Sequence, residues 1–120
     1  MADILVIDDD LQIRIFLKQA LQRAGHVVIL AVDGEDALGM ASNFPVDLAF
    51  INMHMPNCDG FEVFEALTKI NPAAKKVVMS GLEELLPRMK AMGADRVLVK
   101  PLSVETVLET ISTLLEDEAT

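Results

Sequence analysis

Short apolar runs and amphipathic stretches alternate along this chain. Runs rich in Val, Ile and Leu predict five buried strands, at residues 4–7, 27–32, 46–51, 76–79 and 96–99. After the first run, apolar residues recur every three or four positions from Ile13 to Ala24, which predicts a helix that Gly25 ends. Similar spacing predicts further helices at residues 35–43, from Gly60 to about Ile70, and after Ser103.

The two helical segments nearest the C-terminus carry local signals of their own. Pro87 suits the first turn of a helix and disfavours helical geometry at Leu86, so a short helix is expected from about Pro87 to Met92, with residues 81–86 as a loop. Ser103 is a suitable N-cap for the final helix. That helix is expected to bury Val104, Val107, Leu108, Ile111, Leu114 and Leu115.

Strands that alternate with helices and are apolar throughout are typical of a parallel sheet covered on both faces. The predicted fold is therefore α/β, a doubly wound five-stranded parallel sheet with helices on both faces. A length of 120 residues fits a single domain, residues 1–120. In such sheets ligands bind beyond the carboxyl ends of the strands, so the residues after each strand are the candidates for function.

Charge and composition narrow the classes of partner and compartment. A net charge of -9 argues against binding of nucleic acid or of an anionic membrane by this domain, because both need a basic surface. The opening MADILVIDDD has neither the basic start of a signal peptide nor the length of a membrane span. The single Cys58 excludes an internal disulfide and fits a reducing compartment, so the expected location is cytoplasmic.

Polar side chains follow four of the predicted strands and should converge at one edge of the sheet. Asp8, Asp9 and Asp10 follow the first strand, and Asn52 follows the third. Adjacent carboxylates suit a hard cation, for which magnesium, Mg²⁺, is the natural choice. Ser80 and Lys100, after the last two strands, could hydrogen-bond and neutralise a phosphoryl group.

Each of these residues also has an ordinary structural explanation. The three aspartates could simply cap a helix and fill its first turn, and Ser80 could belong to a plain turn. Lys100 is harder to explain in this way, because a solvated lysine has no packing reason to end an apolar strand. The joint placement of the residues favours a site.

Five segments together resemble the receiver domains of two-component response regulators. They are LVIDDD with the following IRIFLKQAL, AVDGEDAL, the MPNCDG turn, VVMSG and GADRVLVKP, and they span essentially the whole chain. The resemblance implies a flavodoxin-like sheet with strand order 2-1-3-4-5. It also implies a histidine kinase or phosphotransfer protein as partner and a downstream output protein or domain, and it leaves a homodimer open.

The resemblance assigns roles to the residues at the strand ends. Asp8 and Asp9 would hold Mg²⁺, with the backbone carbonyl of His54 as a further ligand. Lys100 would pair with the phosphoryl group, and Ser80 would hydrogen-bond it and act as a switch. A receiver usually has an aromatic switch residue three positions before the lysine, where this chain has Val97.

Asn52 occupies the phosphoacceptor position, which in receivers is an aspartate three residues before the Met-Pro of this turn. A carboxamide has no anionic oxygen to attack phosphorus, so phosphoryl acceptor chemistry is expected only if residue 52 is Asp. The amide could still offer its carbonyl oxygen to the metal, but with lower cation affinity. Three explanations stay open: an engineered block, a natural pseudo-receiver that acts by protein binding, and an acceptor created by deamidation.

The leucines after Ser80 form the candidate partner surface. Leu82, Leu85 and Leu86 either fold onto the core or form an apolar patch that, with Val97, faces a partner. An alternative to a receiver is a phosphatase of the haloacid dehalogenase type, whose Asp-x-Asp motif Asp8 to Asp10 superficially fits. Gln12 and the absence of an acidic pair soon after Lys100 argue against it.

Overall fold

Five parallel strands form the central sheet of the computed structural model, which describes residues 1–56 and 58–119. Their spatial order is β2-β1-β3-β6-β7. When these five strands alone are numbered 1 to 5 in chain order, this is 2-1-3-4-5, which confirms the prediction. The strands are β1 (Asp3–Ile7), β2 (Val27–Ala31), β3 (Leu48–Asn52), β6 (Lys75–Ser80) and β7 (Arg96–Val99). All five residues of β3 are buried, as expected for a central strand covered on both faces.

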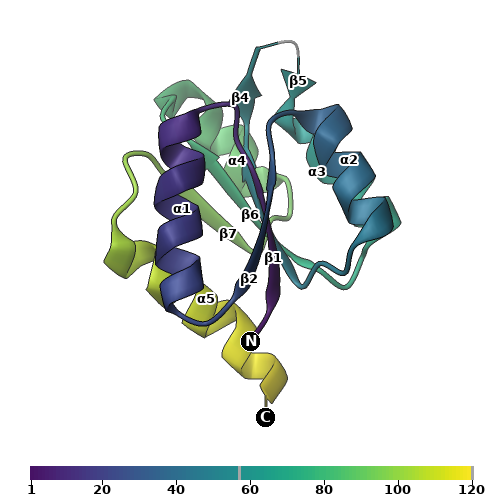
Figure 1. Ribbon diagram of the computed structural model, residues 1–120. Helices are drawn as coiled ribbons and strands as arrows, with labels where there is room; N and C mark the ends of the chain where they lie inside the picture. The colour runs from purple at the N-terminus through teal and green to yellow at the C-terminus, as the bar shows by residue number, and fades with distance from the viewer. Residues whose placement is uncertain (57, 120) are drawn as a thin grey trace.

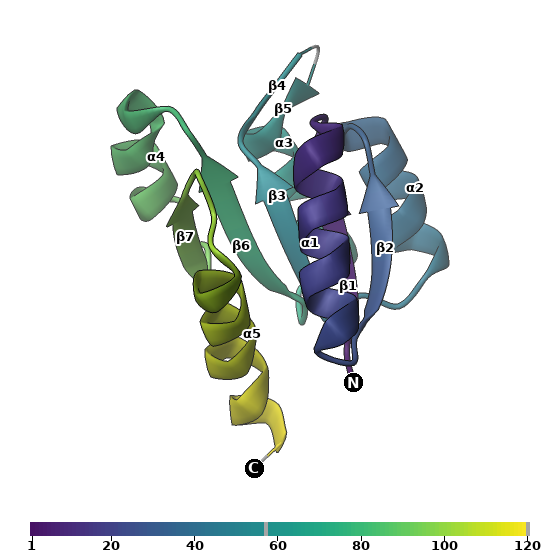
Figure 2. The same ribbon diagram turned by 60° about the vertical axis from the view of Figure 1, so that its left-hand side comes forward.

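Helices cover both faces of the sheet, as Figures 1 and 2 show. On one face, α1 (Leu11–Arg23) and α5 (Val104–Ala119) pack against the sheet around the buried Leu17, Leu21 and Val107. The opposite face is covered by α2 (Gly34–Asn43), α3 (Gly60–Ile70) and α4 (Leu86–Ala91). Apolar side chains of the strands alternate between these two cores, which is the burial that a doubly wound sheet provides.

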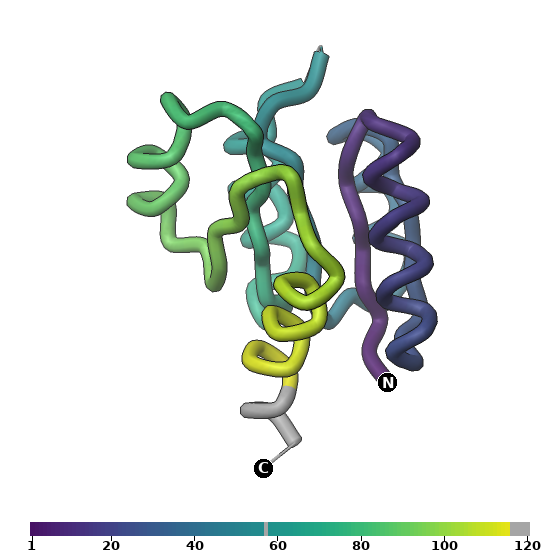
Figure 3. Tube along the Cα trace, turned by 90° about the vertical axis from the view of Figure 1, so that its left-hand side faces the viewer, coloured from purple at the N-terminus to yellow at the C-terminus, as the bar shows by residue number. Residues whose placement is uncertain are grey.

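Aspartates begin several of the helices just beyond the strands. The Asp10 side chain accepts a hydrogen bond from the Gln12 N–H at the start of α1, and Asp33 and Asp59 cap α2 and α3 in the same manner. The predicted stop of α1 is confirmed, because Gly25 has a φ of 93°, a conformation that glycine adopts without strain. Figure 3 follows the chain through these short turns.

Several local features differ from the sequence predictions. The third strand begins at Leu48 and includes Asn52, later than the predicted 46–51. The predicted loop 81–86 contains the 3-10 turn η1 (Glu83–Leu85), and α4 already begins at Leu86, with Pro87 in its first turn as expected. A hairpin of two short strands, β4 (His54–Met55) and β5 (Cys58–Asp59), was not predicted, because two residues are too few to show a periodicity.

The final helix buries a narrower face than its sequence indicates. Val107 and Ile111 are buried, and Leu114 and Leu115 pack partly against them, as predicted. Val104 and Leu108, however, are 44% and 36% exposed, so the prediction that they are buried is wrong. The reason is that α5 packs against the core on the α1 side through a single stripe centred on Val107 and Ile111. Among the helices of the described residues, none is long and apolar enough to cross a membrane.

Candidate functional site

The carboxyl ends of β1, β3 and β7 bring the predicted acidic, amide and lysine side chains together. Asp8 is fully buried directly after β1, and Asn52 is buried as the last residue of β3. Lys100 follows β7, and its Nζ lies 2.7 Å from Asp8 Oδ2. The predicted convergence of Asp8, Asn52 and Lys100 is therefore present in the structure.

The Asp8 carboxylate is held by donors on both oxygens. Lys100 Nζ bonds Oδ2, and the Asp10 N–H donates to Oδ1 over 3.0 Å. Burial raises the pKa of the Asp8 carboxyl above its ordinary value, and the hydrogen bond from Lys100 opposes that rise. The carboxylate thus depends on these donors for its charged form.

Arg14 is a contributor that the sequence analysis missed. From the end of the first turn of α1 it reaches back, and its Nη1 donates to the backbone oxygen of Asp8 over 2.9 Å. This bond fixes the main chain where β1 ends and α1 begins. A signal was present, since a basic residue follows the three aspartates within one helical turn.

The Asn52 carboxamide points its nitrogen, rather than its oxygen, into the acidic cluster. Nδ2 lies 2.8 Å from the His54 backbone oxygen, 3.2 Å from Asp9 Oδ1 and 3.4 Å from Asp8 Oδ1. These three oxygens are the atoms that the sequence analysis assigned to a metal ion. The sequence analysis expected Asn52 to offer its carbonyl oxygen to a metal ion, and this stays a prediction. In the structure, the nitrogen of the side chain faces the three oxygens instead.

The cluster therefore does not fit Mg²⁺ in this arrangement, although its donor atoms are oxygens of the kind the ion prefers. A cation among the three oxygens and an N–H₂ group pointing at them exclude one another. Among residues 1–56 and 58–119, no group of three or more His, Cys, Asp or Glu side chains is placed to hold a metal ion.

The segment after Asn52 folds back closely against the end of β3. Its hairpin stands beyond the sheet at the top of Figure 1, and the Gly60 N–H donates to the Met53 oxygen over 3.2 Å. A Cβ on Gly60 would lie 2.5 Å from the backbone oxygen of Asn52 and 2.5 Å from Met53 Cα. Only glycine fits this approach. The sequence analysis did not single out Gly60, although it closes the MPNCDG turn.

Ser80 lies at the same edge, at the end of β6, and is 3% exposed. Its hydroxyl oxygen accepts the Leu82 N–H over 2.9 Å, and its backbone oxygen accepts the Lys100 N–H over 2.9 Å. The hydroxyl thus belongs to a local turn that joins β6 to the segment carrying the three leucines. Its role as a switch stays a prediction.

The predicted partner surface is divided between core and solvent. Leu85 and Val97 are partly buried and pack against the core on the α3 face, and Leu86 is partly buried. Leu82 is 36% exposed, and the nearby Val99 on β7 is 50% exposed. Leu85 and Val97 thus contribute mainly to packing, while Leu82 stays accessible.

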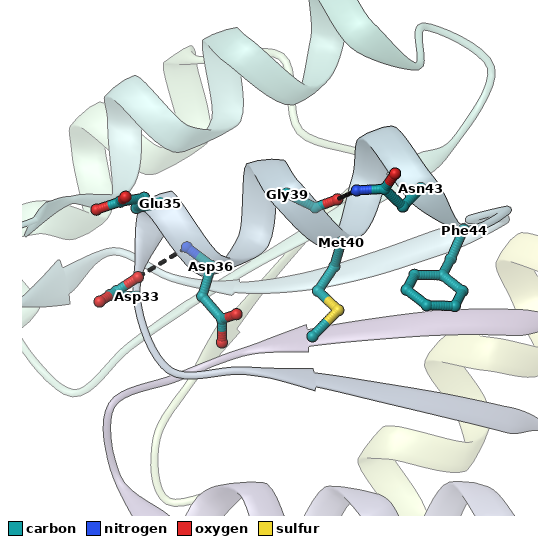
Figure 4. A pocket seen from close by; sticks show the side chains of 7 residues that line it. All are labelled: Asp33, Glu35, Asp36, Gly39, Met40, Asn43 and Phe44. Atoms are coloured by element: carbon teal, nitrogen blue, oxygen red, sulfur yellow. Dashed lines mark hydrogen bonds between the residues drawn. The ribbon is translucent and has the colours of Figure 1, made fainter.

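A hollow of about 500 Å³ lies beside α2 and is lined mainly by acidic and apolar side chains (Figure 4). Asp33 Oδ1 accepts the Asp36 N–H, and Asp36 Oδ2 accepts the Val32 N–H. These carboxylates therefore begin and brace the helix. None of the predicted site residues lines this hollow.

Comparisons with known proteins point to one kind of protein. The family model for the response regulator receiver domain matches residues 4–112. The chemotaxis protein CheY of Treponema pallidum is 35% identical over 118 residues, which cover 94% of this chain and 82% of that protein. The chain spans only about half the length of the mycobacterial relatives named response regulator MprA.

Solved structures agree with the family match. A CheY-like response regulator receiver domain protein from Methanospirillum hungatei has a TM-score of 0.91 and 29% identity, covering 99% of this chain and 97% of that one. TrrA from Thermotoga maritima, solved in complex with Mg²⁺-BeF, has a TM-score of 0.87 and 30% identity, covering 96% of this chain and 100% of that one. A similar protein thus binds Mg²⁺-BeF.

Proposed function

The chain belongs to the family of response regulator receiver domains of two-component signalling, and from this premise we propose that it is a receiver that cannot accept a phosphoryl group and acts by binding other proteins. The observation that carries the proposal is that Asn52 is the last residue of β3, where the resemblance to receivers leads us to expect the acceptor aspartate. The family assignment leaves the alternative of a haloacid dehalogenase phosphatase without support.

The chemistry of an amide explains the loss of phosphoryl transfer. A carboxylate oxygen can attack phosphorus and form an acyl phosphate, whereas the amide nitrogen lone pair is delocalised into its carbonyl group. In this site the nitrogen is also engaged, because Asn52 Nδ2 donates to the His54 oxygen and to Asp9. Lys100 pairs with Asp8 over 2.7 Å, so it is not aimed at an incoming group. Both features favour a site that holds itself together and does not react.

Mg²⁺ belongs to the proposal only for a form that carries Asp at position 52. In that form the Asp8 and Asp9 carboxylates and the His54 backbone oxygen would hold the ion, which would neutralise charge around a phosphoryl group. Lys100 would then pair with a phosphoryl oxygen and Ser80 would hydrogen-bond it. In the chain as it stands, no phosphoryl chemistry is proposed for these residues.

A receiver domain implies a histidine kinase as partner, and we propose that this chain binds such a kinase or a phosphotransfer protein in the cytoplasm. Leu11 and Ile15 support this, because they are 58% and 44% exposed on the part of α1 that follows the aspartates. An output protein, an output domain or a second copy would use the apolar surface around Leu82 and Val99. The net charge of -9 speaks against nucleic acid as the ligand of this domain.

Intact mass spectrometry after incubation with Mg²⁺ and acetyl phosphate tests the proposal. We expect no adduct on the unmodified protein and one phosphoryl adduct on Asn52→Asp. The matched control is Asn52→Asp combined with Lys100→Ala, which should lose the adduct or form it far more slowly. An adduct on the unmodified protein would overturn the proposal. No adduct on any form would show that the site has lost more than its acceptor.

A further inference from the structure

We propose that the Asn52 carboxamide takes the place of a cation in this receiver, so that the strand ends are held together without Mg²⁺. The proposal deepens the proposed function, because it explains how a receiver without phosphoryl chemistry keeps an ordered site. It rests on the contacts of Asn52 with Asp8, Asp9 and His54.

One N–H₂ group serves three oxygens from two separate turns. One of its protons is directed to the His54 oxygen at 2.8 Å, and the other is shared between Asp9 Oδ1 at 3.2 Å and Asp8 Oδ1 at 3.4 Å. These bonds link the turn between β1 and α1 to the turn after β3. A divalent ion bound by the same oxygens would make the same connection.

The surrounding acceptors dictate which way the amide faces. If it were turned over, its carbonyl oxygen would face two carboxylate oxygens and a backbone carbonyl oxygen, none of which can donate a hydrogen bond. Asn52 is 5% exposed and Asp8 is fully buried, so bulk water cannot easily replace the lost bonds. The nitrogen therefore faces the acids for a physical reason.

The donors already present leave little for an ion to add. Asp8 Oδ2 is bonded by Lys100, and Oδ1 is bonded by the Asp10 N–H as well as by Asn52. In the part of the chain that the structure describes, no buried side-chain nitrogen or oxygen lacks a hydrogen-bond partner. To bind Mg²⁺, the protein would have to break the hydrogen bonds that the Asn52 carboxamide donates. The ion would then have one charged ligand fewer than it would have with Asp at position 52.

Differential scanning calorimetry with Mg²⁺ tests this arrangement on three forms of the protein: unmodified, Asn52→Asp and Asn52→Leu. Each is scanned in EDTA and in MgCl₂ up to about 20 mM, with NaCl at matched ionic strength as the control for screening. The unmodified protein should have the highest Tm in EDTA, and MgCl₂ should leave that Tm unchanged beyond the NaCl control. Asn52→Asp should have a lower Tm in EDTA, and that Tm should rise with MgCl₂. The Kd of Asn52→Asp for Mg²⁺ should be at least about a hundredfold tighter than that of the unmodified protein.

Asn52→Leu separates an active donor from a merely missing charge. Its side chain branches at Cγ as that of Asn does, with larger methyl groups, but it cannot donate a hydrogen bond, so it should melt below the unmodified protein in EDTA. If Asn52→Leu does not fold, the unmodified protein alone decides the matter by nuclear magnetic resonance. The side-chain N–H₂ pair of Asn52 should then exchange slowly with solvent and keep its chemical shifts when MgCl₂ is added.

Two results would overturn the inference. They are a Tm of the unmodified protein that rises with MgCl₂ as steeply as that of Asn52→Asp, and N–H₂ signals of Asn52 that exchange freely or shift on addition of MgCl₂. Either result would leave the inability to be phosphorylated intact. Conversely, a phosphoryl adduct on the unmodified protein would overturn the proposed function without changing these measurements, so the two failures can be told apart.

Discussion

Removal of the Lys100 ammonium should cost this protein a large part of its stability. The change is Lys100→Met, which keeps most of the side-chain volume and leaves Asp8 without its ion-pair partner at 2.7 Å. Unit charges at that distance attract by roughly 6 kcal/mol at an effective dielectric constant of about 20, and desolvation of the pair offsets part of this. Loss of one partner of a buried pair typically costs about 3–5 kcal/mol.

The lower end of that range is the expected cost here. Lys100 keeps 18% of its side chain exposed, and Asp8 Oδ1 retains the Asp10 N–H as a donor. We therefore expect a loss of about 3 kcal/mol, which for a domain of this size lowers Tm by roughly 12 °C. The chain has neither Trp nor Tyr, so urea and thermal unfolding should be followed by far-ultraviolet circular dichroism.

The pH dependence and a double-mutant cycle identify the cause. Burial raises the pKa of Asp8, so the folded state takes up a proton more readily than the unfolded state. Without Lys100 that difference grows, and the loss of stability should shrink as the pH falls through the raised pKa. Asp8→Asn should rescue part of the loss, with a coupling of about 2 kcal/mol. A cost below about 1 kcal/mol at neutral pH, or strictly additive effects, would refute the reasoning.

Five further substitutions, at four positions, should be tested in the same unfolding experiments. Gly60→Ala should cost about 2 kcal/mol or more, because its Cβ would meet the Met53 backbone at 2.5 Å, whereas Gly39→Ala, with open space in a helix, should gain about 0.5–1 kcal/mol. Burial lowers the pKa of His26 in the folded state. The stability that neutral His26 contributes is therefore present above the unfolded pKa of 6.5 and is lost as the pH falls through the folded pKa. His26→Gln should flatten the curve of stability against pH between about pH 7 and 5. Lys76 is 6% exposed, so Lys76→Met, which fills the same space without a charge, should change stability by less than about 1 kcal/mol. Lys76→Glu would bury a carboxylate at that place and should cost over about 3 kcal/mol.

The pattern of apolar residues was enough to predict the sheet, its helices and most of their ends. Burial on both faces leaves uninterrupted runs such as that before Asp8, and burial on one side leaves the stripe from Ile13 to Leu21. Because parallel strands end at one edge, the sequence also determined that Asp8, Asn52 and Lys100 would meet.

Only the tertiary structure decided how those groups face one another. The Asn52 nitrogen points at the acids because acceptors from two distant turns surround it, and the close approach of Gly60 depends on how the hairpin folds back. Likewise, α5 buries only the stripe that contains Val107 and Ile111, which leaves Val104 and Leu108 exposed. Periodicity along a chain records how often a position is buried on average, whereas hydrogen-bond direction and packing at an edge depend on neighbours that only the fold brings into contact.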